Sequence, residues 1–339
     1  MADSDQNIIR LAHGGGGSLT NQLIKDLFLR YFDNEYLKKL NDSAILQSSF
    51  SQFAFTTDSF VVSPLFFPGG DIGKLSVCGT VNDLCVSGAK PLYLSIGLII
   101  EEGFSIKELE RIVKSIKDTA QEAGVLVVTG DTKVVEHGKA DGVFINTTGV
   151  GAIEKSIPVT GSRAQSGDKV IISGPIGSHG MSVITSRENF GFHSRIKSDV
   201  APLNGLVNTM LEITEEIHVM RDATRGGVAT VLNEIADQSG VSIVLDEEKI
   251  PVNEDVRGAC EILGFDPLYT ANEGVLVACV GAEDAEELVK AMQKHPYGKK
   301  SSIAGSVKDD SPGRLSLKTT IGSHRVLDMQ TGEQLPRIC

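Results

Sequence analysis

Hydrophobic positions along the chain recur with the period of an α-helix in two clear segments. Residues 19–32 place their apolar side chains three or four positions apart, and Ser18 precedes them as an N-cap. Residues 105–124 begin with Ser105 and carry Glu108 three positions later, which is the pattern of a capping box, and they end on a glycine. Both segments are therefore predicted to be amphipathic helices.

Elsewhere, short β-like runs alternate with helical stretches, which is typical of an α/β protein. A polar turn at residues 163–170 separates two such series. We expect a glycine-rich N-terminal segment and helix at 1–42, a first domain at 43–158, a second domain at 159–331 and a mobile tail at 332–339. Further helices are predicted at 73–87, 180–187, 203–216, 226–239 and 285–294, and second-domain strands at 241–245, 274–280 and 302–307.

The composition is that of a soluble globular protein, with 339 residues of which 41% are hydrophobic and 22% charged. A net charge of −12 argues against a nucleic-acid-binding protein, because phosphate contacts need clustered Lys and Arg. The polar start is no secretory signal, and the most apolar run, residues 91–100, is too short to span a membrane, so we expect a cytoplasmic protein. Four of the five cysteines lie in small or apolar surroundings typical of buried residues, whereas Cys339 ends the chain.

Aspartates beside Gly, Thr or Asn at predicted strand and helix ends are the main candidates for binding chemistry. Carboxylates in such places suit Mg²⁺ that is also bound to phosphate oxygens and water. Each could instead be an N-cap or a turn residue, and Asp71 in particular precedes a predicted helix. The candidates are Asp58, Asp71, Asp83, Asp131 and Asp222.

Two glycine-rich stretches are candidates for phosphate binding. The run "HGGGG" at residues 13–17 could wrap phosphates through its backbone N–H groups, or it could equally be a linker. The stretch "GGDIGKL" at residues 69–75 is not a P-loop, because its spacing is one residue short and Leu75 replaces the Ser or Thr that would bind Mg²⁺. Any ATP site would therefore lack the common fingerprints.

Charged residues at strand ends provide candidate acid–base and anion-binding groups. Lys133 and Glu273 each lie beside an apolar strand, where either could be a solvated edge residue or a proton acceptor. Arg221 and Arg225 could bind phosphate or carboxylate groups. The segment "TRGGVA" at 224–229 opens a predicted helix, so its backbone N–H groups offer an anion site.

Several motifs occur together over nearly the whole chain: "AHGGGG", "SPLFFPGGDIGKLSVCGTVNDL", "VVTGDTKVV", "MRDATRGGVA", "ANEG" and the terminal "PRIC". With them the sequence resembles the HypE family of hydrogenase maturation factors, within the PurM-like superfamily of aminoimidazole ribonucleotide synthetase and selenophosphate synthetase. The "PRIC" ending distinguishes HypE proteins from these relatives. Ala223 stands where the family pattern has proline, a departure that affects no functional side chain.

The resemblance implies a two-domain PurM-like fold in which the first sheet of each subunit forms an intersubunit barrel in a homodimer. ATP and Mg²⁺ would bind in a cleft at that interface, under the glycine-rich N-terminus. The implied metal ligands are Asp58, Asp71, Asp83 and Asp222. The implied ATP-binding residues are these four together with Gly14, Gly15, Gly16, Gly17, Lys74, Asp131, Thr132 and Arg225.

The resemblance also implies a chemistry, in which Cys339 receives a carbamoyl group from the carbamoyltransferase HypF. ATP-dependent dehydration would convert that group to a thiocyanate. The cyano group would then pass to iron on a HypC–HypD complex, as a ligand for [NiFe] hydrogenase, with HypA and HypB as further implied partners. Two N–H protons must leave during dehydration, and we predict that Glu273 and Lys133 accept them. The eleven steps from Asp328 to Cys339 span up to about 36–40 Å, enough to enter the ATP cleft and swing out to a partner.

Two other interpretations stay open from the sequence. An enzyme of the same superfamily could act on a free small molecule and carry an incidental terminal cysteine. Selenophosphate synthetase chemistry would call for a reactive Cys or selenocysteine in the N-terminal glycine-rich loop, and that loop has none here. A non-enzymatic scaffold that docks partners through its C-terminus would show no ATP turnover.

Overall fold

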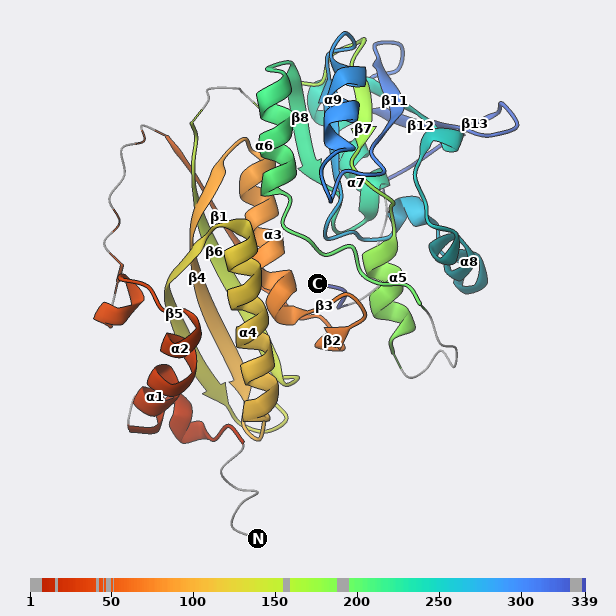
Figure 1. The fold of residues 1–339 in the computed structure, drawn as a ribbon. Coiled ribbons are helices and arrows are strands. Elements are labelled where there is room, and N and C mark those ends of the chain that lie inside the picture. Colours follow the sequence, from red (N-terminus) through yellow and green to blue (C-terminus); the bar gives the residue numbers. More distant parts are fainter. Residues whose placement is uncertain are drawn as a thin grey trace.

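The chain folds into two α/β units that lie side by side, with the C-terminus between them (Figure 1). This computed structural model describes residues 8–15, 18–40, 43–44, 46, 50, 52–154, 159–187, 195–329 and 337–339. The α/β fold predicted from the alternating pattern is confirmed. Within the described residues, no helix is long and apolar enough to cross a membrane.

A four-stranded sheet in the order β1-β6-β4-β5 forms the first unit. Its strands are antiparallel except for the parallel pair β4 and β5. Helices α3 and α4 cover one face, while Phe53, Phe55 and Ile99 are exposed (Figure 1). The bounds are β1 Phe53–Phe60, α3 Ile72–Val86, β4 Lys90–Glu101, α4 Ile106–Ala123, β5 Leu126–Val135 and β6 Val143–Ala152. A two-stranded hairpin, β2 (Phe66–Phe67) and β3 (Gly70–Asp71), precedes α3.

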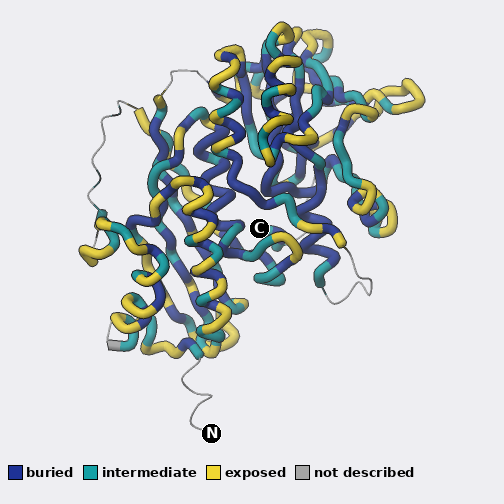
Figure 2. The backbone as a smooth tube through the Cα atoms, in the orientation of Figure 1, coloured by how far each residue is buried: buried dark blue, intermediate teal, exposed yellow. Residues whose placement is uncertain are grey.

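The predicted caps account for both helices of this unit. Ser105 accepts a hydrogen bond from the Glu108 N–H at the start of α4, and Gly124 ends the helix with a φ of 70°. The Asp71 carboxylate accepts from the N–H groups of Gly73 and Lys74 at the start of α3. Almost every residue of α3 is buried, because this helix lies between the first sheet and the second unit (Figure 2).

The N-terminal segment packs beside the β5 edge of the first sheet (Figure 1). Helical backbone runs through residues 18–31, as predicted from the apolar spacing, but a π-helical turn interrupts it. The N-terminal segment contains a 3-10 turn at Leu11–Gly14, α1 at Ser18–Leu23, the π turn at Ile24–Phe28, α2 at Leu29–Tyr31 and a 3-10 turn at Leu37–Lys39.

The second unit is a seven-stranded sheet in the order β13-β12-β9-β11-β7-β10-β8, with helices packed against it (Figure 1). All neighbouring strands are antiparallel except β12 and β9. Its strands are β7 Lys169–Ile172, β8 Ile217–Asp222, β9 Ser242–Asp246, β10 Leu276–Val280, β11 Ser302–Lys308, β12 Arg314–Lys318 and β13 His324–Val326. Its helices are α5 Ser178–Thr185, α6 Asn204–Ile213, α7 Gly227–Ser239, α8 Glu254–Leu263 and α9 Ala285–Met292.

One buried asparagine joins the two units. The Asn82 side chain, on α3, donates to the Ala201 carbonyl at 3.2 Å and accepts from the Leu203 N–H at 2.8 Å. Both atoms of its amide group are thereby satisfied away from water. This contact fixes α3 relative to the second unit, and the acidic residues of both units face each other beside it.

Candidate active site

Four carboxylates from both units lie around the junction between the units. Asp58 comes from β1, Asp83 from α3, Asp222 from the end of β8, and Glu273 from the segment just before β10. Burial, reinforced by the charges of Asp83 and Asp58, raises the pKa of Asp222 to about 7. Burial, followed by the charges of Asp222, Asp199 and Asp58, raises the pKa of Glu273 well above its ordinary value. The sequence candidates therefore include a true cluster of interacting acids.

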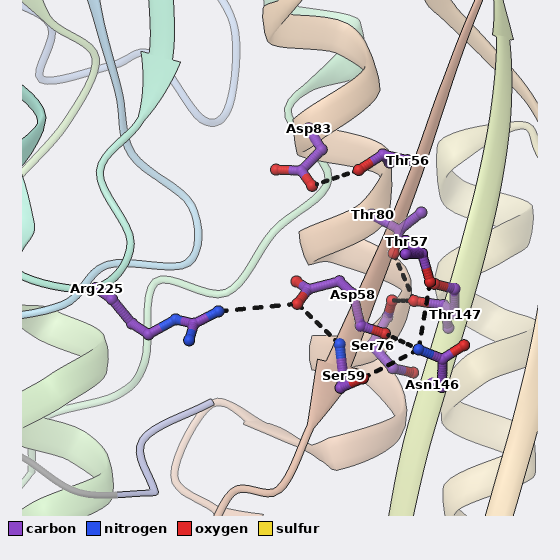
Figure 3. Close-up of polar contacts among 10 residues, drawn as sticks. All are labelled: Thr56, Thr57, Asp58, Ser59, Ser76, Thr80, Asp83, Asn146, Thr147 and Arg225. Atoms are coloured by element: carbon purple, nitrogen blue, oxygen red, sulfur yellow. Dashed lines mark hydrogen bonds and ion pairs between the residues drawn. The ribbon is translucent and has the colours of Figure 1, made fainter. Parts of the chain in front are cut away.

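Strand β1 and helix α3 place the first-unit part of this cluster (Figure 3). Thr56 and Asp58 project from the same face of β1, since side chains two apart share a face. Thr56 donates to the Asp83 carboxylate at 3.0 Å, and Asp58 accepts from the Ser59 N–H at 2.8 Å. Burial raises the pKa of both aspartates. A Cβ on Gly79 would lie 2.8 Å from the Phe60 ring, so only glycine lets α3 approach β1 this closely.

Arg225 forms an ion pair with Asp58, with a separation of 4.0 Å between guanidinium nitrogen and carboxylate oxygen (Figure 3). It is 74% exposed, so it can turn toward solvent or toward a bound anion. The segment after it turns through left-handed Gly226 and Gly227 into α7. Helix α7 begins two residues after Arg225, so the partial positive charge at its N-terminus lies close to Arg225 in the chain.

Glu273 is held by its backbone. Its N–H donates to the Asp199 carboxylate at 3.3 Å, and its carbonyl accepts from Asn82 at 3.3 Å and from the Ala201 N–H at 3.3 Å. Burial raises the pKa of Asp199 to about 7, and its second oxygen has no hydrogen-bond partner. Nothing in the sequence marked Asp199, because "SDV" is no motif and only the fold brings it behind Glu273.

Asp71 does not join the cluster. Asp83 follows it by twelve positions along helix α3, which is about 18 Å along the helix axis. Its carboxylate caps α3, as the sequence alternative allowed, and it lines an open groove between α3 and α4 together with Lys74 and Arg111. The four aspartates predicted to bind Mg²⁺ are therefore not gathered at one place in the subunit.

Lys133 also lies apart from the cluster. It is exposed on β5, where it pairs with exposed Ile99, so it projects from the open face of the first sheet. Asp58 projects from the opposite face of β1, three strands away, which is roughly 14 Å across the sheet. One subunit therefore does not bring its own Lys133 to Glu273.

The other predicted nucleotide-binding residues gather near β5. A cavity of about 280 Å³ opens between this strand and the N-terminal helical segment, and Asp131 and Thr132 line it together with Phe28 and Phe32. Gly14 packs on β5 so tightly that a Cβ would lie 2.5 Å from the Val134 nitrogen. Gly15 is exposed beside it. Gly16 and Gly17 lie outside the described residues.

The chain end lies beside the first-unit part of the cluster. A main-chain carboxylate oxygen of Cys339 accepts a hydrogen bond from the Val61 N–H at 3.1 Å. Val61 follows Asp58 by three residues, which is about 10 Å along an extended strand. Cys339 is half-buried, while the other four cysteines are buried as the sequence predicted. Residues 330–336 lie outside the described residues, so mobility of the tail stays a prediction, but its last three residues have a defined place.

The acidic cluster can bind a hard cation only if other ligands complete the coordination of that cation. No three Asp, Glu, His or Cys side chains stand close enough to hold a metal ion by themselves, among the residues that the structure describes. Burial nevertheless raises the pKa values of Asp58, Asp83 and Asp222, and the charges of neighbouring aspartates add to the shift at Asp83 and Asp222, so the nearby arginines compensate the negative charge here only in part. Mg²⁺ bound through few carboxylates, water and phosphate oxygens fits this arrangement.

Comparison with known proteins defines the class first. The family described as AIR synthase related protein, N-terminal domain, matches residues 40–153, and its C-terminal domain counterpart matches residues 165–318. The chain is thus a two-domain protein of PurM-like architecture, as expected from the sequence.

Relatives within this class are similar over almost the full length. Carbamoyl dehydratase HypE of Azotobacter vinelandii is 51% identical over 98% of this chain and 97% of its own. A crystal structure of hydrogenase maturation protein HypE in complex with ATP matches with a TM-score of 0.94 and 47% identity, over 97% of this chain and 99% of that one. A HypE–HypF complex matches with a TM-score of 0.80 and 51% identity, over 90% and 99% of the two chains. The chain belongs to the HypE family of carbamoyl dehydratases.

Proposed function

We propose that this chain dehydrates a carbamoyl group carried on the Cys339 sulfur to a thiocyanate, with hydrolysis of ATP to ADP and phosphate. The product would supply cyanide ligands to the iron of a [NiFe] hydrogenase during maturation. Family membership supports the reaction, and a relative of this family binds ATP. The observation that carries the proposal is the position of the chain end, hydrogen-bonded to Val61 just beyond Asp58 of the acidic cluster.

The reaction needs a leaving group and two proton acceptors. Oxide cannot leave a primary amide, but an amide oxygen phosphorylated by ATP leaves as phosphate while the carbon–nitrogen bond becomes triple. Positioning and charge stabilisation provide most of the acceleration in phosphoryl transfer. Both N–H protons depart, and Glu273 and Lys133 remain the proposed acceptors. Lys133 must be neutral when it accepts.

The acidic cluster is proposed to hold Mg²⁺ together with the nucleotide phosphates. Asp58, Asp83 and Asp222 would supply oxygen ligands from both units, and Asp71 would act separately at the start of α3. Arg225 and the N-terminus of α7 would bind phosphate oxygens by charge and by backbone N–H groups. Mg²⁺ neutralises phosphate charge when it is bound.

A homodimer is proposed to complete the site. The open face of the first sheet exposes Phe53, Phe55 and Ile99, and large exposed apolar patches commonly mark protein interfaces. Two such faces packed together would form a barrel between subunits and bury Lys133 and Asp131 at the interface. Lys133 of the partner subunit would then serve the carbamoyl group.

Partner proteins follow from the relatives and from the proposed chemistry. A relative forms a complex with HypF, so we propose HypF as the carbamoyl donor to Cys339. A HypC–HypD complex is the proposed cyanide acceptor, with HypA and HypB acting in the same maturation, and we place these steps in the cytoplasm.

Intact mass spectrometry tests the proposal. The protein is incubated with a HypF-dependent carbamoylating system and then with ATP and Mg²⁺. We expect one carbamoyl group on Cys339, followed by loss of one water in the ATP step. An unmodified Cys339, or equal modification of a Cys339→Ala variant, would contradict it. A superfamily enzyme acting on a free small molecule would instead form its product in the low-molecular-weight fraction.

A further inference from the structure

The last three residues occupy a site built from both units of the chain. Backbone groups of the first unit pair with the tail, since the Val61 N–H donates to a main-chain carboxylate oxygen of Cys339 and the Ser63 N–H donates to the Arg337 carbonyl, each at 3.1 Å. The Arg337 Nε returns a hydrogen bond to the Val61 carbonyl at 3.0 Å. The tail therefore extends the edge of the first unit where β1 has ended.

His179 on α5 contacts the tail from the second unit. Its side chain is fully buried, and its Nε2 lies 2.9 Å from the Ile338 carbonyl. A carbonyl only accepts, so Nε2 must carry the proton. Ser198 already accepts from the Val200 N–H at 3.0 Å, so its hydroxyl can donate to His179 Nδ1, 2.8 Å away. The hydrogen bonds thus select the tautomer that donates to the tail.

Further contacts hold Arg337 and Ile338. Arg187 donates to the Arg337 carbonyl at 3.1 Å and to the Ser63 carbonyl at 3.0 Å. Asp141, on the turn between β5 and β6, forms an ion pair with Arg337. Ile338 is 3% exposed and belongs to the apolar core of the first unit.

The backbone of the tail is held in an uncommon conformation at Arg337. Arg337 has a φ of 55°, in the left-handed region that residues with a side chain rarely occupy. Such a conformation persists where surrounding contacts fix it. Contacts from α5, the segment after β1 and the turn after β5 all converge on these three residues, so the arrangement is a docking site and not an incidental contact.

We propose that His179, with Ser198, Arg187 and Asp141, forms a receptor for the main chain of the C-terminal tripeptide and positions the Cys339 sulfur for reaction. This inference rests on the proposed function. The contacts named above involve main-chain oxygens of the tail and the side chains of Arg337 and Ile338. The same contacts can therefore hold the tail before and after the sulfur is modified. His179 is a positioning residue in this account, since it contacts the tail backbone and not the reacting atoms.

The rate of Cys339 alkylation tests docking without any dehydration activity. Iodoacetamide is added to the full-length protein, and intact mass reports the modification. The other cysteines, Cys78, Cys85, Cys260 and Cys279, are each at most 1% exposed, so Cys339 should react first. His179→Ala should raise the rate by about three- to tenfold, the equivalent of one lost hydrogen bond. His179→Gln, which keeps a donor, should restore a rate close to wild type, and His324→Ala, at an exposed site, should match wild type.

A surface variant keeps the test decisive if His179→Ala does not fold. Asp141 is 61% exposed, so Asp141→Asn should leave folding intact while it weakens the ion pair to Arg337. We expect alkylation roughly two- to fivefold faster than wild type, in line with a partly exposed ion pair. Wild-type rates in every folded variant would overturn the docking proposal.

Single-turnover dehydration separates this inference from the proposed function. With the carbamoylated protein, His179→Ala should lower the rate constant of water loss about three- to tenfold, with the ATP dependence of that rate unchanged and His179→Gln restoring it. If the variants change the rate of Cys339 alkylation as described but the carbamoylated wild-type protein never loses water, the docking proposal stands and the proposed function fails. The reverse pattern, with dehydration in wild type but no response in alkylation, overturns docking alone.

Discussion

Burial favours the neutral form of two residues, His179 and Glu273, although it shifts their pKa values in opposite directions. It lowers the pKa of His179 to about 4, and with the neighbouring carboxylates it raises the pKa of Glu273 well above its ordinary value. Neutral His179 can donate one hydrogen bond and accept another, as its two partners require. Glu273 can accept a proton only when its carboxyl group is ionised. Compensation of the negative charges of Asp222 and Asp199 lowers the pKa of Glu273 and so favours its proposed role as a base.

Replacement of Glu273 by Gln should remove the proton acceptor and keep the side-chain volume. We expect the single-turnover dehydration rate to fall by about 100-fold or more, the usual size of a lost acid–base group. ATP affinity, measured by calorimetry, should change by only a few fold. Glu286→Gln, at a residue 82% exposed on α9, serves as the matched control and should behave as wild type. Normal dehydration by the Glu273→Gln variant would exclude Glu273 as the base.

His179 should make stability depend on pH in a defined window. Its pKa is about 4 in the folded chain against 6.5 as its ordinary value, so between these values only the unfolded chain takes up the proton. The free energy of unfolding should therefore fall as pH falls from about 6.5 to 4, by at most about 3 kcal/mol from this residue.

Denaturant unfolding of His179→Gln should show a flatter pH dependence across that window than wild type. His324→Gln, at an exposed residue on β13, should keep the wild-type slope. Parallel pH profiles for wild type and His179→Gln would mean that His179 titrates normally in the folded chain.

At the scale of elements, the start of β10 depends on a glycine. A Cβ on Gly274 would lie 1.9 Å from the Asp199 carbonyl oxygen, which belongs to the backbone and cannot swing aside. Gly274 adjoins Glu273, so any shift that relieves the overlap also displaces the candidate base. Glycine thus allows a close approach that fixes the site in both units: Gly274 does so between two backbone segments of the second unit, and Gly79 does so between α3 and β1 of the first unit.

Gly274→Ala should lower the free energy of unfolding by about 2–3 kcal/mol, because the overlap forces the backbone to move. Gly258→Ala in α8 is the matched control, since no atom lies within 4 Å of its Cβ position. That change should stabilise by roughly 0.5–1 kcal/mol through helix propensity. Chemical denaturation measures both, and similar stability of the two variants would contradict the packing argument.

Regular apolar spacing and caps made most elements predictable. The helices near 73–87 and 105–124 appear within a residue or two, because Asp71, Ser105 and Gly124 carry local start and stop signals. Helix α8 and strands β8, β12 and β13 were not predicted. Strand β8 follows directly on an acidic stretch and offers only a short apolar run, and β12 and β13 are short strands at one end of the sheet.

Motifs in the sequence identified candidate residues of the site, but not which of these residues lie together in the folded chain. Motifs pointed to Asp58, Asp83, Asp222 and Glu273, which the fold brings together. The sequence could not show that Lys133 projects from the other sheet face, because strand order and sheet face are set by tertiary structure. His179, Arg187 and Asp199 lie in no motif. The position of the chain end assigns a role to His179 and Arg187, and the fold alone brings Asp199 to the Glu273 N–H.

At the scale of the whole molecule, the separation of Lys133 from Glu273 makes a prediction about subunit exchange. Lys133→Ala and Glu273→Gln should each be inactive as homodimers. If Lys133 serves the partner's site, a mixed dimer has one intact site and one doubly altered site. Random exchange makes half of the dimers mixed, so about a quarter of wild-type activity should return.

Dehydration is measured after the two variants are refolded together in equal amounts, with each variant refolded alone as the control. No recovery despite mixed dimers, detected by affinity tags, would place Lys133 and Glu273 of one subunit at the same site.

The docked chain end has a consequence for how this protein meets its substrate. The reacting sulfur is covalently part of the chain, so its concentration at the site is set by the length of the tail and not by the solution. Dilution of the protein should leave the rate of water loss per chain unchanged as long as the proposed dimer persists. Each chain can form only one thiocyanate before it is emptied and reloaded. The stoichiometry of a single round is thereby fixed at one product per C-terminus, and sustained turnover should depend on the proposed partner proteins that load and empty Cys339.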